Sequence, residues 1–218
     1  MTGDTLQAIK DCITTGEGAQ MARLCQKALK QGIPAYEIVM KGMNEGMEVV
    51  GKKYESGEYF LPDLVLAGEI MNEGMSVLEP QLAAEGVKSR GIIIAGSVAG
   101  DVHDIGKNIV IAMLRGAGFS VIDLGVNVAA ETFLERAKEH KADIVAASAY
   151  LSTTALELRD IVPLIHEDAS GSIKVVVGGA TVSQEFAREI GADGWAPDAL
   201  QAVKVMDSII HSKGGETL

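Results

Sequence analysis

The chain has 218 residues, of which 47% are apolar and only 4% aromatic, so we expect one large or two small domains with aliphatic cores. Its formal net charge of −11 argues against non-specific binding to nucleic acid or to an anionic membrane. No apolar run approaches the roughly 18 residues of a membrane span, and the first residues do not resemble a signal peptide. Cys12 and Cys25 lie in helical patterns and are expected to be reduced thiols of a cytoplasmic protein.

Residues 1–87 carry only helical patterns. Apolar residues recur at helical spacing, which predicts helices over residues 5–14, 17–30, 34–54 and 62–85. Pro34 and Pro62 suit the first turns of the third and fourth helices, and Gly57 interrupts the pattern between them. Four short amphipathic helices with brief connections indicate a helical bundle.

After a polar join at residues 88–90, strands alternate with helices. The predicted strands are residues 91–98, 119–124, 142–149, 173–177 and 194–196, and the predicted helices are residues 104–115, 131–140, 154–166, 183–190 and 199–211. Near-continuous apolar strands that alternate with helices indicate a parallel sheet covered on both faces. We therefore predict an α/β chain with a four-helix bundle over residues 1–87. A flavodoxin-like or Rossmann-like five-stranded domain should follow over residues 88–218 and bind ligands at the carboxyl edge of its sheet.

One histidine-containing motif follows the first predicted strand. Residues 101–106 read Asp-Val-His-Asp-Ile-Gly, which places His103 at the carboxyl end of a parallel strand. Asp101 can accept one ring N–H of His103, so that the other ring nitrogen can bind a metal. A histidine in such a loop is, on its own, more often a solvated or capping residue. The rest of the sequence must therefore indicate whether His103 binds a metal.

Two further elements lie at compatible strand ends: Ser148 ends the third strand, and Gly178-Gly179 end the fourth. With the histidine motif they resemble the corrinoid-binding signature Asp-x-His-x-x-Gly, Ser-x-Leu, Gly-Gly at its family spacing. One departure is Tyr150, which stands at the leucine position, with Leu151 one place later. Residues 59–80, which begin Tyr-Phe-Leu-Pro-Asp, are similar to the cap over the upper cobalamin face in methionine synthase. The resemblance covers nearly the whole chain and is greatest to corrinoid subunits of three-component methyltransferase systems, which serve methylamines, methanol, glycine betaine or aryl methyl ethers.

The resemblance implies a role for each matching residue. His103 would be the lower axial ligand of cobalt in cobalamin or a related corrinoid. Asp101 and Thr154 would extend it into a hydrogen-bonded relay whose protonation shifts His103 between ligand and non-ligand. Phe60 would cover the cobalt-bound methyl and exclude water and oxygen. The other expected cofactor contacts, several of them small residues beside the slot for the nucleotide tail, are Glu45, Ser97, Val102, Asp104, Ile105, Gly106, Ser148, Tyr150, Leu151, Ser152, Gly178, Gly179, Ala180 and Asp198.

The implied function is that of a methyl carrier that cycles between Co(I) and methyl-Co(III). A substrate-specific methyltransferase would load the methyl, and a second methyltransferase would pass it to tetrahydrofolate or a thiol. Because Co(I) is easily oxidised, a reductive activase is expected as a third partner. The chain shows no nucleophile or acid–base pair of its own, so we do not expect catalysis by the carrier alone.

Three other interpretations remain open. A B12-dependent sensor or regulator would usually carry a DNA-binding domain, for which the sequence shows no pattern. A small subunit of an adenosylcobalamin mutase or aminomutase is disfavoured by the Phe-Leu-Pro cap sequence. A flavodoxin-like domain without a corrin would hold no cobalt. The upper ligand separates the first two from a carrier, because a carrier takes methyl whereas a sensor or mutase takes adenosyl.

Overall fold

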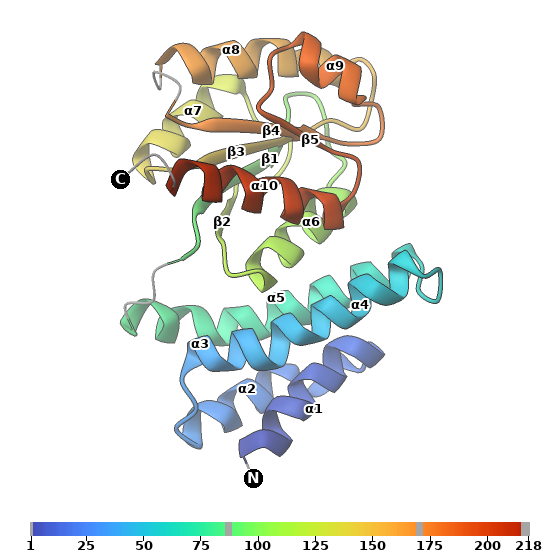
Figure 1. Cartoon of the computed structure of the whole chain (residues 1–218), viewed down its shortest axis with the longest axis vertical. Helices are drawn as coiled ribbons and strands as arrows, with labels where there is room; N and C mark the ends of the chain where they lie inside the picture. Colours follow the sequence, from blue (N-terminus) through green and yellow to red (C-terminus); the bar gives the residue numbers. More distant parts are fainter. Residues whose placement is uncertain (1, 86–88, 169–171, 215–218) are drawn as a thin grey trace. The chain divides into compact units, whose positions relative to one another are not determined.

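The computed structural model describes residues 2–85, 89–168 and 172–214, which form two compact units (Figure 1). The helical unit contains residues 1–88 together with residues 115–118, and the sheet unit contains residues 89–114 and 119–218. The domain boundary predicted after residue 87 lies outside the described residues. No helix in the described part of the chain combines the length and apolarity that crossing a membrane requires.

The helical unit is built from helices alone, as predicted. They are α1 (Thr2–Thr15), the 3-10 turn η1 (Gly18–Gln20), α2 (Met21–Lys30), α3 (Ala35–Glu37), η2 (Ile38–Asn44), α4 (Glu45–Glu55) and α5 (Leu61–Ala84). Gly57 has a φ of +76° and lies in the turn between α4 and α5, a conformation that favours glycine. The third predicted helix is present, but its middle, η2, is a π-helical segment that the apolar spacing did not predict.

Two glycines let α1 approach the η2–α4 helix closely. A Cβ atom added at Gly42 would lie 3.0 Å from Cγ2 of Ile9, and one added at Gly46 would lie 3.0 Å from Cβ of Ile13. Larger residues at these two positions would therefore push α1 away. Flexible methionine side chains fill part of the buried space around these helices; the buried ones are Met21, Met43, Met47, Met71 and Met75.

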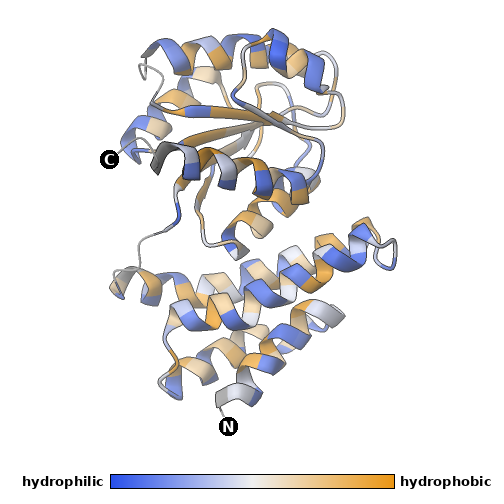
Figure 2. Ribbon diagram, in the orientation of Figure 1, coloured by the Kyte–Doolittle hydropathy of each residue, from blue (hydrophilic) through white to orange (hydrophobic). Residues whose placement is uncertain are grey.

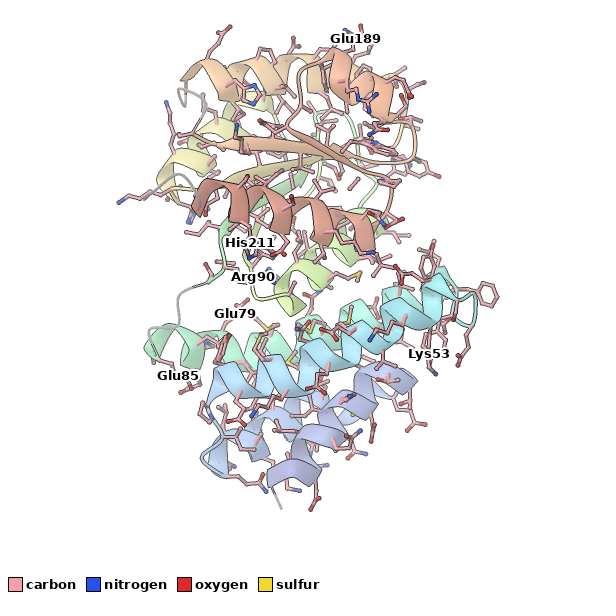
Figure 3. All side chains as sticks on the ribbon, viewed as in Figure 1. Lys53, Glu79, Glu85, Arg90, Glu189 and His211 are labelled. Carbon is pink, nitrogen blue, oxygen red and sulfur yellow. The ribbon has the colours of Figure 1, made fainter. Side chains whose placement is uncertain are left out.

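Two side chains labelled in Figure 3, Glu85 just after α5 and Lys53 of α4, hold neighbouring segments of the helical unit. The Glu85 carboxylate, just after α5, accepts the backbone N–H groups of Ala35 at 2.7 Å and Tyr36 at 3.2 Å. These are free N–H groups at the start of α3, so Glu85 caps that helix. Near the end of α4, Lys53 pairs with Glu58 at 2.9 Å across the turn that leads to α5.

The sheet unit contains five parallel strands in the order β2-β1-β3-β4-β5, which confirms the predicted flavodoxin-like fold. The strands are β1 (Ile92–Ser97), β2 (Ser120–Asp123), β3 (Ile144–Ser148), β4 (Lys174–Gly178) and β5 (Gly194–Ala196). Figure 2 shows the strands in the apolar colour, as expected for a sheet covered on both faces. Ser97 pairs with Ser148, and Ser148 with Gly178, so these three residues are neighbours at the carboxyl edge.

Helices cover both faces of this sheet (Figure 1). They are α6 (Ile105–Gly116), α7 (Ala130–Glu139), α8 (Leu158–Asp168), α9 (Gln184–Glu189) and α10 (Ala199–Gly214), with a 3-10 turn η3 (Thr154–Glu157) before α8. The helices α7, α8 and α9 share one core with the sheet. Within that core the ring of Phe133 packs on β1 at Gly96, where a Cβ atom would lie 2.9 Å from the ring. The helices α6 and α10 lie on the other face.

Candidate functional site

The connection between β1 and α6 carries His103 and is braced from a neighbouring loop. Gly100 turns the chain with a φ of +74°, and its N–H donates to Oδ1 of Asn127 at 2.7 Å. The N–H of Asn127 donates in turn to the carbonyl of Asp101 at 2.9 Å. Asn127 itself has a φ of 55°, which asparagine tolerates better than most residues. This brace was not predicted, because nothing in the sequence links Asn127 to the histidine loop.

The carboxylate of Asp101 is the centre of the site, and only 1% of the residue is exposed. Its Oδ1 accepts Nδ1–H and the backbone N–H of His103 at 2.7 and 3.0 Å. Its Oδ2 accepts the backbone N–H of Tyr150 at 2.7 Å and the hydroxyl of Thr154 at 2.6 Å. Burial by itself raises the pKa of Asp101, but the hydrogen bonds from Thr154, Tyr150 and His103 outweigh it and hold that pKa well below its usual range. Asp101 is therefore an ionised acceptor at neutral pH.

An ionised Asp101 fixes the tautomer of His103. A carboxylate can only accept, so Nδ1 of His103 must carry the proton. In the neutral imidazole, the other ring nitrogen, Nε2, then has a free lone pair, and no hydrogen bond to it is formed by any residue that the structure describes. The side chain is 43% exposed, so Nε2 is accessible. One histidine nitrogen supplies one coordination position, which fits a metal that already carries a macrocyclic ring.

Thr154 lies at the buried end of the same chain of hydrogen bonds. Its hydroxyl donates to Asp101 and lies 3.0 Å from the carbonyl of Leu151, so its position is fixed from two directions. The structure thus brings together the three residues predicted to form the relay, from Thr154 through Asp101 to His103. Because Asp101 is held ionised, a mobile proton of the predicted relay would not reside on this carboxylate at neutral pH.

Two serines support the histidine loop from the ends of β1 and β3. The hydroxyl of Ser97 donates to the carbonyl of His103 at 2.8 Å, and it lies 3.1 Å from the hydroxyl of Ser148. Since Ser97 has one hydroxyl hydrogen, Ser148 is the donor in the contact between them. The predicted role of Ser97 was to leave room for the cofactor tail. The structure shows that it also holds the backbone of the residue that would bind cobalt.

The glycines of the motif differ in what a Cβ atom at each position would meet. A Cβ atom on Gly179, which has a φ of +121°, would lie 2.0 Å from the carbonyl oxygen of Ala149, and one on Gly178 would lie 2.8 Å from that of Ala196. The packing of the sheet unit itself therefore requires both. Gly106 differs, because a Cβ atom there would meet no protein atom within 4 Å. The space beside Gly106 is open to a ligand.

The other predicted contacts in the sheet unit lie mostly in loops at this edge. Val102, Ile105, Tyr150 and Leu151 are exposed apolar side chains, and such exposure is typical of ligand-binding surfaces. Three further predicted residues are exposed and polar or small: Asp104, Ser152 and Ala180. Asp198 caps α10, since its carboxylate accepts the N–H of Gln201 at 2.8 Å, and its predicted contact with the cofactor stays a prediction.

Two predicted contacts belong to the helical unit. Phe60 directly precedes α5 and is 67% exposed, while its backbone N–H donates to Asp63 at 2.7 Å in a helix cap. Glu45 begins α4 and pairs with Lys10 of α1 at 2.9 Å. The roles predicted for both residues toward the cofactor stay predictions.

The residues at the carboxyl edge fit a corrinoid. The structure provides an oriented imidazole with one free nitrogen, a buried carboxylate behind it, and open space at Gly106. A cofactor base and tail inserted at this edge, as the resemblance implies, would need small residues at the strand ends, and Ser97, Ser148 and Gly178 stand there in register.

Comparison with known proteins agrees with this fit. Family models described as B12 binding domain match residues 91–204 and residues 5–79. A corrinoid protein of Desulfitobacterium hafniense (strain Y51) is 43% identical over 94% of this chain and 97% of that protein. Dimethylamine corrinoid protein 3 of Methanosarcina acetivorans is 41% identical over 91% of this chain and 93% of that protein.

A solved structure gives the same result for the fold. The methanol:cobalamin methyltransferase complex of Methanosarcina barkeri contains a chain that superposes with a TM-score of 0.81 at 29% identity, over 95% of this chain and 80% of that one. The family models and the close relatives together span both units. The chain therefore belongs to the corrinoid proteins, a family that binds B12.

Proposed function

We propose that this protein is the methyl carrier of a multi-component methyltransferase system, with His103 as the lower axial ligand of cobalt. The observation that carries the proposal is the geometry of His103, whose Nδ1 is held by the buried Asp101 and whose Nε2 is free. Relatives named as methylamine corrinoid proteins support the carrier role. When bound, the corrinoid would supply the cobalt chemistry of methyl transfer, which we propose alternates between Co(I) and methyl-Co(III).

The residues of the chain would hold and tune this cofactor. Asp101 keeps the imidazole in the tautomer that can bind a metal, and Thr154 holds Asp101 from behind. Ser97 and Ser148 fix the backbone of the histidine loop, and the hydroxyl oxygen of Ser148 is available to the nucleotide tail. These groups orient a ligand and hold protons, and the chain needs no further catalytic group for a carrier role.

Partner enzymes would then provide substrate selectivity. The chain that superposes on this protein comes from a complex named as a methanol:cobalamin methyltransferase, which supports a substrate-specific methyltransferase as the first partner. We propose a second methyltransferase, acting on tetrahydrofolate or a thiol, and a reductive activase as the other two. Phe60, an exposed phenyl ring in the helical unit, is proposed to shield the methyl group between transfers.

The first experiment is an anaerobic spectroscopic titration with methylcobalamin. The parent protein should bind one equivalent with a histidine-dependent change in the visible spectrum. His103→Ala should lose that change and bind at least about tenfold more weakly. His211→Ala, which removes an exposed histidine of α10, is the matched control and should behave like the parent. An unchanged spectrum in His103→Ala would refute axial ligation, and preferential binding of adenosylcobalamin would favour a sensor or mutase.

A second experiment tests the shielding role of Phe60. Phe60→Ala should speed the loss of the methyl group under light and oxygen, because a shielding ring has been removed. Tyr36→Ala removes another exposed aromatic ring of the helical unit and should leave the decay rate unchanged. Equal decay rates in Phe60→Ala and the parent would remove Phe60 from this role.

A further inference from the structure

Tyr150 contacts the histidine in a way that the corrinoid-binding signature does not imply. Its ring stacks on the imidazole of His103, with ring centroids 4.2 Å apart and an angle of 23° between the planes. The signature has leucine at this position, and leucine has no flat face to offer. Tyr150 is 52% exposed, so its ring is placed over His103 rather than in the core of the sheet unit.

Tyr150 is also joined to His103 through Asp101. Its backbone N–H donates to Oδ2 of Asp101 at 2.7 Å, while Oδ1 of the same carboxylate accepts Nδ1–H of His103 at 2.7 Å. The loop after β3 and the loop after β1 therefore meet twice, once through the carboxylate and once through the two rings. A change of the Tyr150 side chain would remove only the second contact.

The two contacts restrain different motions of the imidazole. The hydrogen bond fixes where Nδ1 lies, but it lets the ring rock about the line from Nδ1 to Asp101. A flat aromatic face against the ring opposes that rocking, because tilting the imidazole would break the stacked contact. Stacking therefore fixes the plane of the imidazole, and with it the direction of the Nε2 lone pair.

We propose that Tyr150 is a positioning residue, whose ring holds the plane of the His103 imidazole ready for the cofactor before it binds. This inference rests on the proposed role of His103 as the axial ligand. A preorganised ligand loses less conformational freedom on binding, so its effect falls on the rate and strength of cofactor binding. No covalent step is assigned to Tyr150.

Two substitutions separate the ring face from every other property of Tyr150. Tyr150→Phe keeps the ring and removes the hydroxyl, whereas Tyr150→Leu keeps an apolar side chain of the kind in the signature and removes the flat face. Both keep the backbone N–H that Asp101 accepts. Because Tyr150 is half exposed, both variants should fold, which their circular dichroism would verify.

The first measurement uses the cofactor-free protein. The ring protons of His103, assigned in an NMR spectrum by their loss in His103→Ala, should be shifted upfield by the Tyr150 ring. The shift should persist in Tyr150→Phe and disappear in Tyr150→Leu. Identical His103 shifts in all three proteins would overturn the proposal, and this result is independent of whether the chain carries methyl groups.

The second measurement follows methylcobalamin binding by stopped flow. Tyr150→Leu should bind about threefold to tenfold more slowly or more weakly, and Tyr150→Phe should match the parent. Equal binding by Tyr150→Leu and the parent would overturn the positioning role. Equal losses in Tyr150→Phe and Tyr150→Leu would do so as well, since the hydroxyl would then be responsible. If His103→Ala itself bound like the parent, the proposed axial ligation would fail instead.

Discussion

The two units of the chain differ in how many polar residues they bury. In the described residues of the helical unit, Thr5 is the buried polar side chain, and the rest of the core is apolar. The sheet unit buries Ser97, Asp101, Lys107 and Thr154. A buried polar group lowers the stability of the fold unless its hydrogen bonds are made. A cluster of such groups therefore indicates that this part of the sequence does more than fill the core.

All four buried polar residues of the sheet unit lie near the carboxyl ends of strands. Ser97 ends β1, Asp101 and Thr154 follow β1 and β3, and Lys107 of α6 holds Asp123 at the end of β2 at 2.7 and 2.9 Å. At the opposite edge, none of the residues that the structure describes is a fully buried polar residue, and the Asp193 carboxylate there is only partly buried. The helical unit is thus organised for packing, and one edge of the sheet unit is organised to hold a ligand.

The largest effect is expected when the centre of the polar cluster is removed. Asp101→Ala would leave the backbone N–H groups of Tyr150 and His103 without their acceptor, and should lower the free energy of unfolding by about 3–5 kcal/mol. It should also weaken corrinoid binding about tenfold to a hundredfold. Trp195, the one tryptophan of the chain, lies in β5 and reports urea unfolding of the sheet unit by fluorescence.

A surface carboxylate of the same unit provides the control for Asp101. Glu189→Gln breaks the exposed ion pair with Arg159 and should change stability by less than about 1 kcal/mol. If Asp101→Ala cost no more than Glu189→Gln, the polar cluster would not be a stabilising unit. If Asp101→Ala lost stability but bound the corrinoid normally, the cluster would serve folding alone.

The apolar pattern predicted most of the fold. Short runs of branched residues predicted the first four strands, since a strand buried on both faces has few polar residues. The fifth strand, Gly194–Ala196, was also predicted, although it contains no branched residue. The π-helical segment η2 escaped, because a helix with one wide turn keeps nearly the same apolar spacing on either side. The tight contact of α1 at Gly42 and Gly46 escaped for a related reason, since a glycine in a helical pattern does not show which helix it faces.

The sequence predicted which residues meet at the site better than how its loops are held. The motif pointed to His103 and Asp101 and the family resemblance to Thr154, and the structure brings the three together. The brace by Asn127 and the stacking of Tyr150 were not predicted, because each depends on how two loops approach one another in space. Asp198 was predicted as a cofactor contact, and the structure shows the helix cap that it forms.

An intermediate effect is expected at Asp193, a structural carboxylate near the start of β5. It accepts the N–H of Val175 at 2.8 Å and pairs with His166 and Lys174 at 2.7 and 3.0 Å. Burial by itself raises the pKa of Asp193, but these three partners outweigh it and lower the pKa. A lowered pKa in the folded state means that the ionised carboxylate stabilises the fold above the unfolded pKa of about 3.9, and that this contribution is lost as pH falls through the folded pKa.

Asp193→Asn should therefore cost about 1–2 kcal/mol at pH 7. The difference from the parent should shrink as pH falls from about 4 through the lowered pKa of the folded state, below which the parent carboxylate is also neutral. Urea midpoints from Trp195 fluorescence at pH 7, 4 and 3 provide the measurement. A difference that stayed constant over this range would mean that the charge of Asp193 does not stabilise the sheet unit.

The smallest effect is expected in the helical unit, at Glu45. Its ion pair with Lys10 joins two partly exposed side chains, 48% and 27% exposed, and such pairs contribute little. Glu45→Gln should change the free energy of unfolding of the helical unit by less than about 0.5 kcal/mol, measured by circular dichroism. The predicted contact with the corrin edge makes a separate claim, namely that the same change weakens methylcobalamin binding.

Lys10→Met separates these two roles of Glu45. It removes the same ion pair but leaves the carboxylate, so it should match Glu45→Gln in stability and the parent in cofactor affinity. Equal affinity in all three proteins would show that Glu45 serves only the surface of the bundle. Weaker binding in Glu45→Gln alone would show that Glu45 contacts the cofactor. The helical unit would then also hold the ligand, and it would not be organised for packing alone.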